Sequence, residues 1–360
     1  MLGEHEFIGR SGELELFERA LQVAQDGEPS LVLVSGDAGI GKSSLVGEAA
    51  QRCAGRCLVA PCVRMGGEQI PLAPLMSLLR RLQRADPDLL DAAPVLRDWI
   101  DPQSSGSVRH TDVLASVTDL VIAASDRTPP LLFVVEDAHW ADVATWDLVD
   151  YLARNLVDES VVVAVTYRTV DANREPELRR RIAELARLPH VSRIVLGGWT
   201  AEEVGHRIET MIGAPPSAGL ISDIVRRGQG NPYFTQELLA ARQADDDLPD
   251  VVSDLVETDL QRLPTASQNV VAALSVLGRP ADQDLVVAVA ELDDDAEGAI
   301  RAAIDAGMVI VEGDTYQPRH ALIAEVVYQK LLPGERRRRH RLAAESLQAR
   351  VSGSRQADQI

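Results

Sequence analysis

The sequence predicts an α/β domain with a parallel sheet and flanking helices, followed by two smaller, mainly helical domains. Five short runs are continuously apolar instead of alternating, which is typical of strands buried on both faces of a parallel sheet. The segments between these runs have helical spacing. Beyond Gly198 the apolar runs give way to helical patterns, and short strand candidates return only around Gly313 and Asp314.

The first domain is expected to span residues 1–198. Apolar residues recur at helical spacing before the first run, and Ser11 stands where it could cap that helix. Asp142 is placed to cap another helix, over "ADVATWDLVDYLARNL". The apolar runs are "LVLVS" (31–35), "CLVAPCV" (57–63), "LLFVV" (131–135), "VVVAVT" (161–166) and "RIVL" (193–196).

A small helical domain is expected over 199–244, ending in the charged stretch "ARQADDDLPD". Helical patterns follow near 251–262, 264–277, 281–290 and 294–306. Two short strand candidates in "MVIVEGDTYQPRH", coming after these helices, suggest the wing of a winged-helix domain over 245–349. We expect residues 350–360 to form a disordered tail.

Composition narrows the class of protein. The chain has 36 Lys plus Arg against 55 Asp plus Glu, a formal net charge of -19 at pH 7, which disfavours a broad nucleic-acid or anionic-membrane surface. No apolar run reaches the roughly 18 residues that span a bilayer, and the start lacks a signal-peptide pattern. The three cysteines are expected to be reduced thiols. These features favour a cytoplasmic protein without membrane partners.

Lysine is rare in this chain, where Lys42 and Lys330 are the two examples and other basic residues are arginines or histidines. Gly36, Gly41, Lys42 and Ser43 satisfy the pattern G-x-x-x-x-G-K-[ST], directly after a strand candidate and before a helix candidate. The pattern predicts a loop that surrounds phosphate oxygens with backbone N–H groups. Lys42 would reach the β- and γ-phosphates and Ser43 would bind Mg²⁺. The residues expected to contact nucleotide here are Gly36, Ala38, Gly39, Ile40, Gly41, Lys42, Ser43 and Ser44.

Two acids follow the third apolar run. In "LLFVVEDAHWAD", Glu136 and Asp137 stand where a P-loop ATPase places a carboxylate on Mg²⁺ and another beside the attacking water. Acids after a strand are also ordinary helix-start residues, so the pair predicts a metal site chiefly through its combination with the upstream loop.

Six stretches together resemble, in order, the signature stretches of the STAND ATPases. They are "FIGRSGELELF", "GDAGIGKSSLV", "LLFVVEDAHWAD", "VVVAVTYR", "GNPYFTQELL" and "RHALIAEVVYQKLLPGERRRRHRLA". The likeness is strongest to the N-terminal ATPase module of the large MalT-like and LuxR-type bacterial transcriptional regulators, and it runs from about Phe7 to Ala349. It implies an AAA+-like P-loop domain, a small helical domain and a winged helix. It also implies an ATP/ADP-controlled switch with slow, Mg²⁺-dependent hydrolysis, nucleotide-dependent self-association and an inducer that stays unknown.

The resemblance also assigns residues. It implies that four consecutive residues help to hold adenine and ribose: Phe7, Ile8, Gly9 and Arg10. Arg168 is similar to the sensor arginine near the γ-phosphate, and Pro232 of "GNP" to the proline that contacts adenine. His320 resembles the winged-helix histidine that contacts the β-phosphate of ADP, although an ordinary core histidine is an open alternative. His139 and Trp140 are expected to be packing residues beside the site.

The second motif departs from the family pattern, which often begins with Asp, because here Glu136 comes first and Asp137 second. This order leaves open which acid binds Mg²⁺ and how fast hydrolysis is. Two alternatives remain: an origin-recognition-like AAA+ loader that binds DNA, and a nucleotide-gated scaffold without useful turnover. The acidic charge favours the switch, so direct DNA binding is not expected. Family regulators continue beyond this point, so we expect an N-terminal fragment or a stand-alone switch.

Overall fold

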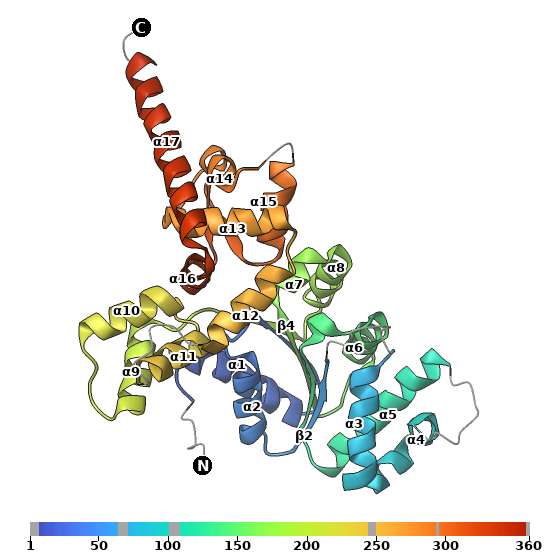
Figure 1. Ribbon diagram of the computed structural model, residues 1–360. Coiled ribbons are helices and arrows are strands. Elements are labelled where there is room, and N and C mark those ends of the chain that lie inside the picture. Colours follow the sequence, from blue (N-terminus) through green and yellow to red (C-terminus); the bar gives the residue numbers. More distant parts are fainter. Residues whose placement is uncertain (1–6, 64–70, 101–108, 244–249, 293–294, 358–360) are drawn as a thin grey trace. The chain divides into compact units, whose positions relative to one another are not determined.

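A computed structural model describes the chain except residues 1–6, 64–70, 101–108, 244–249, 293–294 and 358–360. The chain divides into two compact units, Met1–Gly197 and Gly198–Ile360, and Figure 1 labels most of their helices and two of the strands. Each unit buries its own apolar side chains.

The first unit contains a five-stranded sheet in the order β2-β3-β4-β1-β5, and every pair of neighbours is parallel. The expectation of an α/β domain with a parallel sheet is confirmed. Strand β4 lies between β1 and β3, so the carboxyl ends of these three strands are neighbours at one edge of the sheet. The strands are β1 (Ser30–Gly36), β2 (Arg56–Pro61), β3 (Leu131–Glu136), β4 (Val161–Arg168) and β5 (Val191–Leu196).

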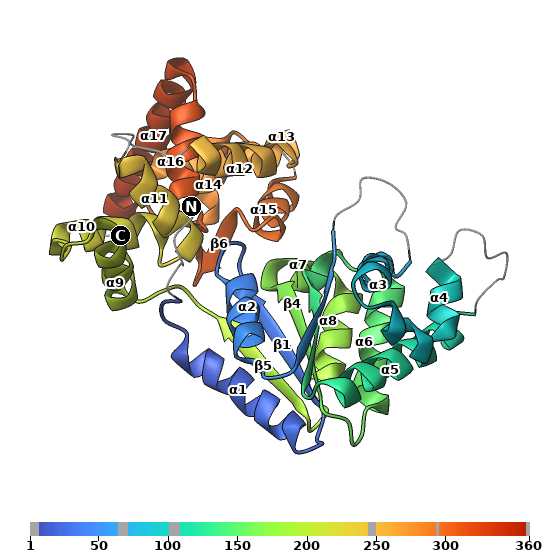
Figure 2. The same cartoon turned by 90° about the horizontal axis from the view of Figure 1, so that it is seen from below.

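Helices cover both faces of this sheet. Helices α1 and α2 lie on one face, and α3, α5, α6 and α8 lie on the other (Figure 2). The helical segments are α1 (Ser11–Gln25), α2 (Lys42–Arg52), α3 (Ala73–Ala85), η1 (Pro87–Ala92), α4 (Pro94–Ile100), α5 (His110–Arg127), η2 (Ala138–Trp140), α6 (Val143–Asn155), α7 (Thr169–Arg174) and α8 (Pro176–Leu185).

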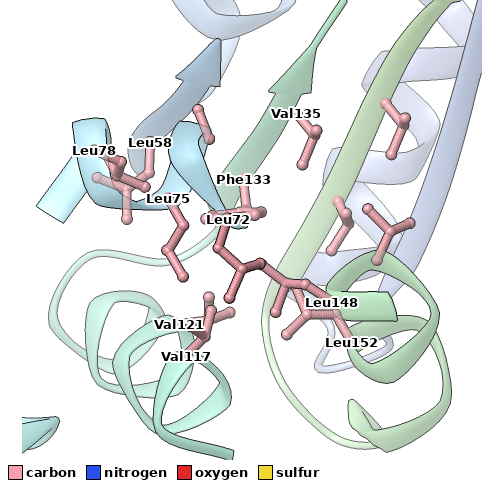
Figure 3. Packing of buried hydrophobic residues seen from close by; sticks show 14 of the residues in the cluster. Leu58, Leu72, Leu75, Leu78, Val117, Val121, Phe133, Val135, Leu148 and Leu152 are labelled. Atoms are coloured by element: carbon pink, nitrogen blue, oxygen red, sulfur yellow. The ribbon is translucent and has the colours of Figure 1, made fainter. Parts of the chain in front are cut away.

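Because helices pack on both faces of the sheet, the sequences of the strands are continuously apolar. Along β1, Val32 and Val34 pack towards α1 and α2, whereas Leu31 and Leu33 belong to the cluster on the opposite face. Successive side chains of a strand point to opposite faces, so both faces must be apolar. Figure 3 shows the larger cluster, where Phe133 of β3 lies among aliphatic side chains of α3, α5 and α6.

One of the two expected helix caps is present. The Asp142 carboxylate accepts a hydrogen bond of 3.2 Å from the backbone N–H of Thr145 and caps α6, as predicted. The prediction for Ser11 was wrong, because Ser11 is already the first residue of α1 and Arg10 is the N-cap. Gly9 and Arg10 both have positive φ, 69° and 64°, so the turn is completed before Ser11.

The second unit is mainly helical and has one core that includes buried residues from α9 to α17. Strands β6 and β7 form an antiparallel hairpin close to the strand candidates near Gly313. The expected boundary at 244/245 lies outside the described residues. The elements are α9 (Ala201–Ile212), α10 (Ala218–Gly228), α11 (Pro232–Gln243), α12 (Asp250–Gln261), α13 (Thr265–Leu277), α14 (Gln283–Ala290), α15 (Ala296–Asp305), β6 (Val309–Glu312), β7 (Thr315–Pro318), α16 (Ala321–Lys330) and α17 (Pro333–Ala357).

The end of the chain differs from the expectation. Helix α17 continues to Ala357, so residues 350–357 are helical rather than a disordered tail, and 358–360 lie outside the described residues. This stretch lacks proline, and it mixes weak helix formers around Gly353 with good ones such as Ala and Gln. Within the described part of the chain, no helix combines the length and the apolar character needed to cross a membrane.

Candidate functional site

The G-x-x-x-x-G-K-S segment connects β1 to α2. Gly39 and Gly41 have φ of 71° and 99°, in the left-handed region that glycine enters without steric cost. Gly41 is the N-cap of α2, and Lys42 is its first residue. Ser43 and Ser44, in the first turn, are exposed. The loop therefore leaves the N-terminal turn of α2 accessible, where backbone N–H groups lack helical partners.

Lys42 is held inside this loop. Its side chain is buried, and Nζ donates hydrogen bonds to the carbonyl oxygens of Gly36 (3.1 Å) and Asp37 (2.8 Å). Burial, followed by the nearby charge of Arg168, lowers the pKa of Lys42 to about 8, while Asp137 and Asp37 act in the opposite direction. An anion in the loop would favour the charged ammonium and relieve this shift.

The acid pair occupies the end of β3. Glu136 is the last residue of the strand, and Asp137 adopts φ 55°, which turns the chain into η2. The Asp137 backbone N–H donates a hydrogen bond of 2.9 Å to Oγ1 of Thr166, a buried residue of β4. Burial and the neighbouring Glu136 raise the pKa of Asp137, and Lys42 and Arg168 partly oppose the shift. The turn and this hydrogen bond attach the acid pair to the next strand.

Arg168 ends β4, and its backbone is in register with Gly36 of β1. Its guanidinium carbon lies 5.3 Å from the centroid of the Trp140 ring. The charge of Arg168 contributes to the lowered pKa of both Lys42 and His139, so the three side chains share one electrostatic environment. The candidate sensor arginine is thus positioned at the same sheet edge as the loop and the acids.

His139 is buried between two carboxylates. Its Nδ1 lies 3.9 Å from Asp137 Oδ1 and its Nε2 lies 3.7 Å from Asp171 Oδ2, both beyond hydrogen-bonding distance. Neither ring nitrogen has a hydrogen-bond partner within the described residues. Burial, Arg168 and Lys42 lower the pKa of His139 to about 3, so the ring is neutral at physiological pH. The neutral imidazole of His139 is therefore buried beside Asp137, one of the candidate site residues.

Thr166 and Asp171 lie against residues of the candidate site, and sequence reasoning missed them. A detectable signal existed for Thr166, because it is the polar residue at the end of the apolar run "VVVAVT". Asp171 reads as an ordinary first-turn acid of α7. Its position beside His139 depends on the direction of α7 after the end of β4, and the local sequence pattern does not show that direction.

The segment expected to hold adenine and ribose lies against the phosphate loop. Arg10 donates a hydrogen bond of 3.2 Å from Nη2 to the Ile40 carbonyl oxygen, and it also donates to the carbonyl of Gly197. Ile8 is buried, whereas Phe7 and Gly9 are partly exposed. The structure thus brings Arg10 to the loop that contains Lys42.

Pro232 and His320 lie in the second unit. Pro232 is buried and begins α11, and His320 is the N-cap of α16. His320 Nδ1 is 2.9 Å from Gln229 Oε1, and its ring meets the ring of Phe234 edge-on at 5.3 Å. Pro232 and His320, the nucleotide-contacting residues that the resemblance assigns to the second unit, therefore lie in neighbouring parts of that unit.

The oxygen-bearing residues fit magnesium. Within the described ranges, no three His, Cys, Asp or Glu side chains form a cluster that could hold a metal by itself. Mg²⁺ in phosphate-transfer sites is usually held by one or two carboxylates together with substrate phosphates. The Ser43 hydroxyl with Glu136 or Asp137 matches that donor set and requires the phosphates to complete it.

Comparison with known proteins shows similarity to an ATPase domain and to ATPase-like folds. Residues 6–164 match the family model described as the AAA ATPase domain. A Walker-type ATPase of Pyrococcus abyssi has a similar structure, with 14% identity, a TM-score of 0.63, and coverage of 90% of this chain and 97% of that one. A STAND protein with a tetratricopeptide repeat sensor from Pyrococcus horikoshii gives 16% identity and a TM-score of 0.44, over 95% of this chain and 46% of its own.

A curated relative is considerably longer than this chain. An uncharacterized protein of Rhizobium meliloti is 26% identical over 388 residues, which cover 93% of this chain and 36% of the relative. The chain therefore spans about a third of that protein's length. At 14% identity, the likeness to the Pyrococcus abyssi ATPase shows the fold alone. The fold, the domain match and the loop geometry together show that this chain contains a P-loop ATPase-like α/β module.

Proposed function

We propose that this chain binds ATP and ADP with Mg²⁺ and hydrolyses ATP slowly, as a regulatory switch. One observation carries the proposal. The carboxyl ends of the adjacent strands β3, β4 and β1 carry the acid pair, Arg168 and the loop that contains Lys42. Ligands of open α/β sheets bind outside the carboxyl ends of the strands. Cationic and anionic groups from three strands meet at this edge.

Each side chain at this edge would have a different role in phosphoryl transfer. Lys42 and the N-terminal N–H groups of α2 would bind the β- and γ-phosphate oxygens. Ser43 and Glu136 would hold Mg²⁺, which supplies a charge that neutralises the phosphates. Asp137 would orient the attacking water, and Arg168 would stabilise charge on the γ-phosphate. Phe7, Ile8, Gly9 and Arg10 would contact adenine and ribose, an assignment that rests on the resemblance.

The switch is proposed to use the second unit. The resemblance would have Pro232 contact adenine and His320 contact the β-phosphate of ADP, with β6 and β7 as the wing of a winged helix. If so, His320→Ala should weaken ADP binding by about 1 to 3 kcal/mol more than ATP binding and favour an open or self-associating form. Affinities and X-ray scattering with each nucleotide test this. Equal losses without a change in compactness would make His320 an ordinary structural residue.

The wider role is proposed from the same resemblance: a cytoplasmic regulatory ATPase module of a MalT-like or LuxR-type transcriptional regulator. The match to about a third of a longer relative is compatible with a module of a larger protein. Nucleotide-dependent self-association is the expected output of the switch.

Nucleotide identification and turnover test the proposed function. Mass spectrometry of nucleotide released from the purified chain should find ADP or ATP, and single-turnover assays should show Mg²⁺-dependent hydrolysis. Nucleotide binding without measurable turnover would instead support the scaffold alternative. Tight, salt-sensitive binding of duplex DNA in a gel shift would support a DNA loader.

A further inference from the structure

Arg168 is a half-buried arginine whose side-chain N–H donors make no hydrogen bond to any residue that the structure describes. In the part of the chain that the structure describes, its guanidinium has neither a hydrogen bond nor an ion pair, and its recorded contact is with the Trp140 ring. Arg181 provides a contrast in the same unit. Its side chain, 16% exposed, is paired with the carboxylates of Asp147 and Glu177.

Trp140 is held in place independently of Arg168. It ends the short helix η2, and its backbone N–H donates a hydrogen bond of 2.9 Å to the carbonyl oxygen of Asp137. The ring packs against the core of the first unit and lies 4.7 Å, between centroids, from the ring of His139. The same turn that presents the acid pair therefore also presents an aromatic face to Arg168.

A cation over an aromatic face is stabilised by the ring's quadrupole, and this attraction does not consume the N–H donors of a guanidinium. A carboxylate partner would occupy those donors and would have to be displaced before Arg168 could bind a phosphate. The aromatic contact localises Arg168 at a moderate free energy and leaves its hydrogen-bonding fork available.

We propose that Trp140 holds Arg168 in a resting position and thereby sets how strongly the site discriminates ATP from ADP. This inference rests on the proposed function. ATP draws Arg168 from the ring to the γ-phosphate, whereas ADP lacks the group that would compete with the ring. Because ATP has to break the contact with the ring and ADP does not, the contact weakens ATP binding in the wild type and leaves ADP binding unchanged. From the usual strength of cation–π contacts, the selective weakening amounts to between about twofold and thirtyfold.

The assignment makes Trp140 a positioning residue that acts through Arg168. A ring that only filled space would stabilise the fold and would affect ADP and ATP affinities alike. A ring that competes for Arg168 changes their ratio, and it changes the ratio only while Arg168 is present.

The test compares Trp140→Leu with the conservative Trp140→Phe, each in the wild-type and Arg168→Ala backgrounds. Calorimetry with Mg²⁺ would give affinities for ADP and for a non-hydrolysable ATP analogue. Trp140→Leu should bind the analogue about two- to thirtyfold more tightly with ADP affinity unchanged, and Trp140→Phe should fall between it and the wild type. In the Arg168→Ala background the Trp140 substitutions should leave the affinity ratio unchanged.

Equal changes for both nucleotides, or a change in the ratio that persists without Arg168, would overturn the resting-position assignment while leaving nucleotide binding intact. If Trp140→Leu does not fold, the comparison of Trp140→Phe with the wild type decides, and an identical affinity ratio in these two proteins counts against the assignment. Absence of nucleotide binding by the wild-type chain would overturn the proposed function and this inference together.

Discussion

The backbone N–H of Asp137 donates a 2.9 Å hydrogen bond to the hydroxyl of Thr166, joining the end of β3 to the end of β4. Asp137 is in the left-handed region at φ 55°, a conformation that Asp adopts more readily than most residues but that needs support from its surroundings. Thr166 is buried, so no solvent is available to replace the hydroxyl. The position of this acid therefore depends on a residue of the neighbouring strand.

Thr166→Val keeps the side-chain volume and removes the acceptor. The unpaired N–H of Asp137 should cost about 1 to 3 kcal/mol of unfolding free energy, and turnover should fall more than ADP affinity because the acid is no longer held. Urea denaturation and steady-state hydrolysis measure both effects. Thr166→Ser is the control, since it keeps the hydroxyl. Turnover lost equally in the two variants would show that the hydroxyl is not the cause.

Glu136→Gln and Asp137→Asn should have different effects. We expect Glu136→Gln chiefly to weaken Mg²⁺-dependent affinity and Asp137→Asn to slow hydrolysis more than binding, because the first acid is assigned to the metal and the second to the water. Titration of Mg²⁺ at fixed ATP, together with turnover, separates them. Reversed phenotypes would mean that the Glu-Asp order has exchanged the roles of the two acids.

Nucleotide affinity should fall as the pH rises through the pKa of Lys42. Burial lowers that pKa to about 8, and a phosphate binds the protonated ammonium, so binding is nearly fully supported about one pH unit below that pKa and weakens as the pH rises through it. With one proton coupled to binding, ADP affinity should drop roughly tenfold between pH 7 and pH 9. Calorimetry of wild type and Lys42→Ala provides the comparison. A profile of equal slope in both proteins would assign the pH effect to another group.

His139 should destabilise the fold in acid. Burial lowers its pKa to about 3, so between that value and its ordinary pKa the unfolded chain binds a proton that the folded chain does not. Unfolding free energy should therefore fall with decreasing pH below about 6.5, by up to about 1.4 kcal/mol per pH unit from this group. His139→Phe should lose that component in urea denaturation at pH 7 and pH 5. Parallel pH dependences would show that His139 does not contribute.

The sequence predicted those strands and turns whose residue pattern is local. The continuous apolarity of "LLFVV" and "VVVAVT" predicted β3 and β4 because strands buried on both faces have no polar side, and the glycine spacing predicted the turn into α2. The order of the strands was not predicted, since the periodicity of β4 is the same wherever it lies in the sheet.

The contacts made across strands could not be predicted either. The hydrogen bond between Asp137 and Thr166, the place of Asp171 beside His139, and the stacking of Arg168 on Trp140 all depend on β4 lying next to β3. Each of these residues has an ordinary interpretation in its own segment, as the end of a strand, a helix-start acid or a packing aromatic. Their proximity in space follows only from the sheet topology.

The central claim, that the loop around Lys42 binds nucleotide phosphates, is tested most directly by calorimetric titration of ADP into the wild type, Lys42→Ala and Lys42→Arg. The ammonium lies among backbone carbonyls of its own loop, so both variants should keep the circular dichroism spectrum of the wild type. Both should lose ADP affinity by at least about tenfold, the alanine because the charge is gone and the arginine because its planar fork does not fit a loop shaped around an ammonium. Wild-type affinity in both variants would contradict the account.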